Sequence, residues 1–139
     1  MPRFSVWATR LSLLYFLLGI TFGALLLTAK AYPLPPAIWG LLPVHIEFLL
    51  MGWIVQFVFA VAYWILPRFT FGPNRGRPAL AWLALALLNA GIGLAAFGVR
   101  WPGANWLLWG RGLEIAAVLL FGWLLWRRAK PTETGRKEG

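Results

Sequence analysis

The chain has 139 residues, of which 60% are hydrophobic and only 12% charged, a composition outside the range of soluble domains. It contains no cysteine and one histidine, which excludes disulfides, thiolate metal sites, iron–sulfur clusters and a multi-histidine metal cage within one chain. A formal net charge of +9 would suggest a nucleic-acid partner in a soluble protein. In so apolar a chain the charge is first read as a signal of membrane topology.

Four apolar runs follow one another along the chain. The first, residues 11–29, carries no charge between Arg10 and Lys30 and matches the roughly 20 residues that cross a bilayer core of about 30 Å. It is longer than the apolar part of a signal peptide. Prolines separate the later runs, which lie at 43–66, 78–99 and 106–126. The sequence therefore predicts an all-α, integral membrane four-helix bundle in residues 1–130 and a polar cytoplasmic tail at 131–139.

Basic residues lie mostly on one side of the four predicted spans. An even number of spans places both termini on the same side as the second connection. Ten basic residues fall on that side: Arg3, Arg10, Arg68, Arg75, Arg77, Arg127, Arg128, Lys130, Arg136 and Lys137. Three fall on the other: Lys30, Arg100 and Arg111. Because basic loops are retained in the cytoplasm, we expect cytoplasmic termini and a multi-pass protein of a prokaryotic cytoplasmic (inner) membrane, with no nucleic-acid partner.

Few polar side chains interrupt the spans, and each costs free energy in a bilayer unless it is paired. His45 and Glu47 lie near the start of the second span, and Arg111 and Glu114 lie in the first two turns of the fourth. The opposite directions of these spans place all four residues in the outer third of the bilayer, as one candidate cluster. A simpler alternative is that Arg111 and Glu114, three residues apart on one helix, pair only with each other.

The face of the second span that carries His45 has a particular pattern. At helical spacing it continues through Phe48, Gly52 and Gln56. A glycine two turns below an imidazole leaves a flat recess beside aromatic rings, against which a macrocycle bound by that imidazole could lie. The alternative is a histidine that serves only the core or the membrane interface. Gln56 and Asn89, on different spans, are expected to form an interhelical hydrogen bond.

The segment 42–53, LPVHIEFLLMGW, continues to FAVAYWILPR at 59–68 and resembles helix II of the haem-copper oxidase superfamily. The closest likeness is to the catalytic subunits of cytochrome oxidase and nitric oxide reductase, with a Pro-x-His start and a Tyr-x-x-x-Pro exit. The first span, with Tyr15, Gly19 and Gly23, looks like the N-terminal part of the same subunits. Gly19 and Gly23 also form a small-xxx-small pair, which favours close helix packing. The resemblance covers roughly residues 10–70, and later spans match only in number and apolar character.

In that family the helix II histidine is an axial ligand of the low-spin haem, and the matching position here is His45. The resemblance implies a b-type haem, but no copper and no complete oxidase or reductase activity, because the ligands of the binuclear centre come from helices that this chain does not contain. With one imidazole per chain, a six-coordinate haem needs a ligand from a second protomer. A homodimer with two His45 side chains on one shared haem would supply it. The alternative is a five-coordinate haem in each protomer.

Other haem contacts are predicted from position. Phe48, Gly52 and Gln56 would line the macrocycle, and Arg111 is the nearest cation for the propionates, with Arg100 second. Met51, six residues after His45, points elsewhere and is not expected to be an axial ligand.

The leading interpretation is a membrane b-type haem-binding protein that acts in electron transfer or haem handling with an unidentified redox partner. The alternative is a haem-free assembly or structural subunit of a respiratory membrane complex. A third class is a small proton-coupled transporter that uses Glu47 or Glu114. Two observations count against this class. Small four-helix exporters usually carry their carboxylate in the first span, which has none here, and the one-sided distribution of basic residues opposes a dual-topology dimer. The chain has no aspartate and no phosphate-binding loop, so soluble hydrolase and nucleotide-binding interpretations find no support.

Overall fold

The computed structural model describes residues 1–66, 77–98, 105–126 and 128–129. All regular secondary structure in this part of the chain is helical, and it contains four helices long and apolar enough to cross a membrane: Arg3–Ala31, Pro36–Ile65, Pro78–Phe97 and Trp106–Trp126. The all-α prediction with four helices of spanning length is thereby confirmed for the described residues. The predicted tail at 131–139 lies outside them, as do seven of the basic residues used for topology: Arg68, Arg75, Arg100, Arg127, Lys130, Arg136 and Lys137.

Helix α1 spans Arg3–Ala31, so it starts before the apolar run that the sequence marked. The helix ends where a proline follows in the sequence. Tyr32 precedes Pro33 and adopts an extended backbone, with φ −128° and ψ 147°, as residues before proline prefer. Within the helix, the hydroxyl groups of Thr21 and Thr28 donate to backbone carbonyls one turn earlier, which satisfies them without any other partner.

The second spanning helix is built from four consecutive segments. A 3₁₀ segment, η1 (Pro36–Leu41), leads into α2 (Leu42–Glu47), then into a π-helix, η2 (Phe48–Val55), and finally into α3 (Gln56–Ile65). The π-helix is eight residues long, whereas most π segments are single turns and many of them lie at functional sites. It separates the turn that carries His45 from the turn that carries Gln56.

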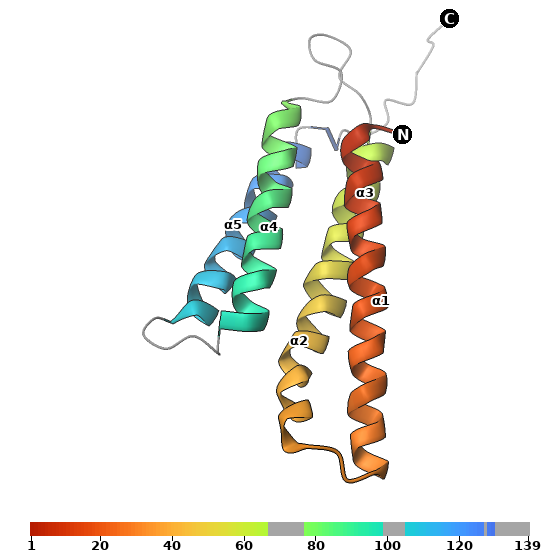
Figure 1. Ribbon diagram of the computed structural model, residues 1–139. Coiled ribbons are helices and arrows are strands. Elements are labelled where there is room, and N and C mark those ends of the chain that lie inside the picture. The colour runs from red at the N-terminus through yellow and green to blue at the C-terminus, as the bar shows by residue number, and fades with distance from the viewer. Residues whose placement is uncertain (67–76, 99–104, 127, 130–139) are drawn as a thin grey trace, which may run out of the picture.

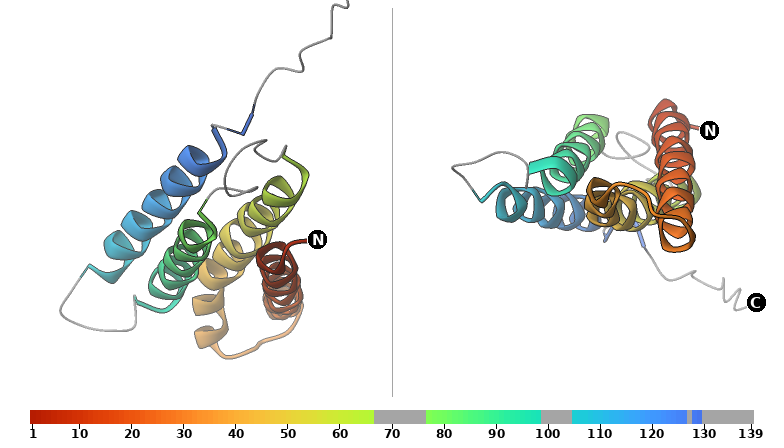
Figure 2. Two further views of the ribbon diagram at one scale, coloured as in Figure 1. Left: turned by 90° about the horizontal axis from the view of Figure 1, so that it is seen from above. Right: turned by 60° about the horizontal axis from the view of Figure 1, so that its bottom comes forward.

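The remaining helices, α4 (Pro78–Phe97) and α5 (Trp106–Trp126), form an antiparallel pair. Glycines allow their backbones to approach. A Cβ atom on Gly91 would lie 2.9 Å from the carbonyl oxygen of Gly110, and one on Gly110 would lie 2.9 Å from that of Gly91. Figures 1 and 2 show this pair beside a second one, formed by α1 and the run from α2 to α3. Helix α1 begins and α5 ends at the same end of the molecule, called here the upper end because it is uppermost in Figure 1.

Aromatic packing joins the helices near the upper end. The rings of Phe59 and Phe121 stack with their centroids 3.9 Å apart, and Phe4 contacts Tyr63 at 4.7 Å. Arg128 is also buried there, with 1% of its surface exposed. It donates hydrogen bonds to the carbonyl oxygens of Tyr63 (3.1 Å) and Leu66 (2.6 Å), the groups that a helix C-terminus leaves without partners. Arg128 therefore ties the end of α5 to the end of α3.

Candidate functional site

His45 lies in α2 at the opposite, lower end of the molecule, and its imidazole faces α1. Nδ1 lies 2.8 Å from the carbonyl oxygen of Gly19. Since a carbonyl oxygen can only accept a hydrogen bond, Nδ1 must carry the proton. In the neutral imidazole, the lone pair is then on Nε2, the nitrogen left free to bind a metal. The ring is half-buried.

Two glycines of α1 make room for the second helix. A Cβ atom on Gly23 would lie 2.6 Å from Cε1 and 3.0 Å from Nδ1 of His45, and one on Gly19 would lie 2.6 Å from the side chain of Leu49. Real Cβ atoms do not approach other atoms so closely, so both positions exclude larger residues unless their neighbours move. The Gly19 and Gly23 pair thus packs within the chain, between α1 and the helix that carries His45.

The recess at Gly52 is filled by the chain itself. A Cβ atom on Gly52 would lie 2.5 Å from Cγ and 2.9 Å from Cβ of Tyr15. The hydroxyl group of Tyr15 donates to Oδ1 of Asn89 at 2.9 Å, which holds the ring in place. Gly52 does lie on the same face as His45, as its spacing suggested, but that face packs against α1. Tyr15 therefore occupies the space in which the sequence pattern placed a macrocycle.

The other two residues predicted to line the macrocycle, Phe48 and Gln56, are also engaged in packing. Phe48 contacts the ring of Tyr15 with a centroid separation of 4.9 Å and is buried. Gln56 is fully buried, and its Oε1 accepts a hydrogen bond of 2.8 Å from Nδ2 of Asn89. The predicted interhelical bond between Gln56 and Asn89 is confirmed. Together with the bond from the Tyr15 hydroxyl group, this bond forms a continuous hydrogen-bond network across three helices. The sequence pattern had not placed Tyr15 in this network.

Arg111 joins two carboxyl groups from different helices. Its Nη2 lies 2.6 Å from Oε2 of Glu47 on α2, and its Nη1 lies 2.7 Å from Oε2 of Glu114 on α5. Both glutamate side chains are 3% exposed, whereas that of Arg111 is 45% exposed. Three members of the predicted four-residue cluster therefore meet, and Arg111 and Glu114 also pair directly. His45 does not join them, because residues two apart on a helix point to different sides.

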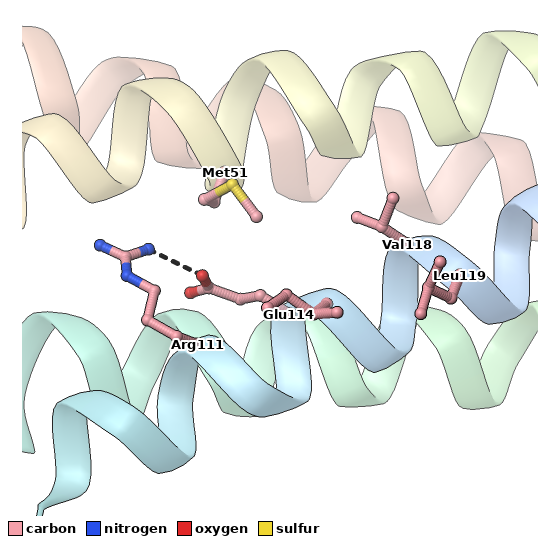
Figure 3. A pocket seen from close by; sticks show the side chains of 6 residues that line it. Met51, Arg111, Glu114, Val118 and Leu119 are labelled. Atoms are coloured by element: carbon pink, nitrogen blue, oxygen red, sulfur yellow. Dashed lines mark hydrogen bonds and ion pairs between the residues drawn. The ribbon is translucent and has the colours of Figure 1, made fainter.

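A cavity of about 210 Å³ adjoins this ion-pair cluster. It lies between η2 and α5 and is lined by Met51, Arg111, Glu114, Ile115, Val118 and Leu119 (Figure 3). The second oxygen atoms of the two carboxyl groups, Oε1 of Glu47 and Oε1 of Glu114, are buried and have no hydrogen-bond partner among the described residues. The surface that the cavity presents is nearly all apolar, so these oxygen atoms lie behind its wall and do not face it.

The residues present fit a haem only in part. The contact between Nδ1 of His45 and Gly19 leaves Nε2 as the nitrogen that would bind an iron. Gly52 is covered by Tyr15. Arg111, predicted to bind the propionates, is already paired with two carboxyl groups, and Arg100 lies outside the described residues. Within the part of the chain that the structure describes, no three histidine or acidic side chains gather into a metal site.

No protein-family model, curated protein or solved structure matches this chain.

Proposed function

We propose that the protein is a membrane b-type haem-binding protein in which Nε2 of His45 is an axial ligand of the iron. The observation that carries this proposal is the 2.8 Å contact between Nδ1 and the carbonyl oxygen of Gly19. Histidines that bind metals almost always donate their other ring N–H to a carbonyl or carboxylate, which fixes the tautomer and raises the basicity of the ligating nitrogen. Gly23 supports the arrangement by leaving space for the ring on α1.

In this proposal the residues around His45 have separate roles. Gly19 holds the proton on Nδ1, and His45 presents Nε2. Tyr15, Phe48, Gly52 and Gln56 keep α1 and the second helix together. Bound haem supplies one-electron chemistry, which suits electron transfer or haem handling.

We assign both termini to the cytoplasm of a prokaryotic cell and His45 to the outer third of the cytoplasmic membrane. The asymmetric distribution of lysine and arginine supports this orientation. The fold is compatible with it, since α1 begins and α5 ends at the same end of the molecule.

The presence of a single histidine in the chain also bears on how many chains bind one haem. The chain contains one histidine and no cysteine, and Met51 lines the cavity beside Arg111 and Glu114, whereas His45 faces Gly19 on α1. Since the described residues place no second histidine or cysteine near His45, we assign a second strong axial ligand to another molecule. We propose a homodimer in which His45 of each chain binds one shared haem, and we expect a haem-to-chain ratio of about one to two if the iron is bis-histidine ligated. A ratio of one to one with a five-coordinate spectrum would contradict the shared haem and leave His45 ligation intact.

The direct test is haem titration of the purified protein, followed in the visible spectrum. We expect a Soret band that His45→Ala abolishes and that His45→Gly recovers when imidazole is added, since imidazole can take the place of the deleted ring. Ile46→Ala is the matched control, because Ile46 is the adjacent residue and is 45% exposed. A protein that binds no haem, or a His45→Ala variant that binds it as well as the unaltered chain, would refute the proposal.

The second candidate function is that of a haem-free assembly or structural subunit of a respiratory membrane complex. The packing of Tyr15 over Gly52 favours it, because the chain fills the recess without any cofactor. It predicts stable co-purification with a larger membrane complex and no effect of His45→Ala on that association.

A further inference from the structure

The outer face of α1 near the upper end carries basic and aromatic side chains in one row. Arg3, Trp7 and Arg10 follow one another at intervals of four and three residues, which places them on the same face of a helix. All three residues are exposed, and α1 lies at the edge of the bundle (Figures 1 and 2). No described helix therefore covers this face.

Arg10 is the best defined cation of this face. Its Cζ lies over the ring of Trp7, 5.6 Å from the ring centroid. This cation–π contact directs the guanidinium group toward the N-terminus of α1, and so toward Arg3. Both acidic side chains in the described part of the chain pair with Arg111, near the lower end. The N–H groups along the edge of the Arg10 guanidinium therefore face no described carboxylate and can bind an external anion.

The position of Arg10 along α1 matches the level of lipid phosphate groups. Residues 11–29 carry no charge and are about 28 Å long at about 1.5 Å per residue, close to the bilayer core of about 30 Å. In a chain that spans the bilayer, Arg10 therefore lies where the core meets the head groups. Trp7 lies about one turn farther out, in the region where amphipathic aromatic rings are favoured.

The same face of α1 becomes apolar beyond Arg10. Leu14 and Leu17 follow at helical spacing, and they are 51% and 57% exposed. Exposed leucines beneath a cation match an acyl chain beneath a phosphate group, whereas a free phosphate ion would use the cation alone. A zwitterionic head group would also bring an ammonium group toward these arginines, which repel it. The surface therefore favours a lipid with a net negative head group.

We propose that this face of α1 binds an anionic phospholipid. The phosphate group lies on Arg10 and Arg3, and an acyl chain follows the two leucines. Arg10 donates from the edge of its guanidinium group, the geometry in which arginine makes two parallel hydrogen bonds to phosphate. Trp7 positions that group. Binding requires no haem, so this proposal and the proposed function can fail separately.

The test is native mass spectrometry of the full-length protein, released from micelles that contain phosphatidylglycerol or phosphatidylcholine with the same acyl chains. We expect the unaltered protein to retain phosphatidylglycerol in preference to phosphatidylcholine. Arg10→Gln should lower the affinity for phosphatidylglycerol about fivefold, the effect of one basic residue at a membrane surface. Trp7→Leu leaves the charge unchanged, yet it should lower the affinity about twofold to fivefold because the guanidinium group loses the ring that holds it.

Arg77→Gln and Trp126→Leu are the matched controls. Arg77 is an exposed residue at the start of α4, and Trp126 is an 81% exposed residue at the end of α5, both at the upper end. They undergo the same chemical changes away from this face, so the affinity should change less than about twofold. The proposal is overturned if Arg77→Gln weakens binding as much as Arg10→Gln, since net charge alone would then explain the attraction. Equal retention of phosphatidylcholine, or unchanged affinity in Trp7→Leu, would also overturn it.

Discussion

Gly23→Ala tests the link between the fold and the proposed haem ligand without changing the ligand itself. The new Cβ atom would lie 2.6 Å from Cε1 of His45, whereas carbon atoms in contact are separated by about 3.5 Å or more. The imidazole must therefore move away from α1 by about 0.9 Å. That movement would stretch the Nδ1 to Gly19 oxygen distance from 2.8 Å to beyond about 3.5 Å, where no hydrogen bond remains.

We expect this loss to weaken haem binding by about 10-fold to 100-fold, the usual effect of removing the hydrogen-bond partner of a metal-binding histidine. The assay is haem titration followed at the Soret band, with thermal unfolding as a check on folding. Gly93→Ala is the control, because a Cβ atom there meets no atom within 4 Å. If Gly23→Ala binds haem with the same affinity and spectrum as Gly93→Ala, the contact between Gly19 and His45 does not position an iron ligand.

Three further predictions concern stability, measured as the free energy of unfolding in mixed micelles. A double-mutant cycle with Gln56→Leu and Asn89→Leu should give a coupling energy of about 0.6–1.7 kcal/mol; additive effects would mean that the hydrogen bond does not contribute. Arg111→Leu should lower the stability by about 3 kcal/mol, because two buried carboxyl groups lose their cation, and a loss below about 1 kcal/mol would contradict a closed cluster. Gly91→Ala should cost about 2 kcal/mol by forcing α4 and α5 apart, while Gly93→Ala should be neutral; equal effects would refute the close approach of the two backbones.

Hydropathy located the helices because four long apolar runs in a short chain leave few other arrangements. It placed the start of the first one late, since Trp7, Ala8 and Thr9 precede Arg10 and a single basic residue does not end a helix. The pair of Gln56 and Asn89 was also predictable, because isolated amides in apolar helices have few possible partners.

The environment of His45 was harder to predict, because it depends on how separate helices pack. Helical spacing correctly grouped His45 with Gly52 on one face, but it cannot tell which neighbour covers that face. Tyr15 covers it, and the only sequence signal was the spacing of Gly19 and Gly23 on the same helix as Tyr15. Individual residues also gave no sign of the π-helix at Phe48–Val55, which arises from hydrogen bonding along the backbone.

Arg128 illustrates a different limit. Its position after an apolar run made it one more basic residue for the topology count, yet its guanidinium group is buried against carbonyl oxygens of Tyr63 and Leu66. Those acceptors lie more than sixty residues earlier in the chain. Only the three-dimensional packing of α5 against the end of α3 brings them within reach.

The central claim, that His45 binds a redox-active haem, is tested most directly by the difference spectrum of the purified, haem-loaded protein with and without reductant. The account predicts sharpened visible bands on reduction, reversal on reoxidation, and loss of the signal in His45→Ala but not in Ile46→Ala. A colourless protein that takes up no haem, or a difference spectrum identical in His45→Ala, would contradict it.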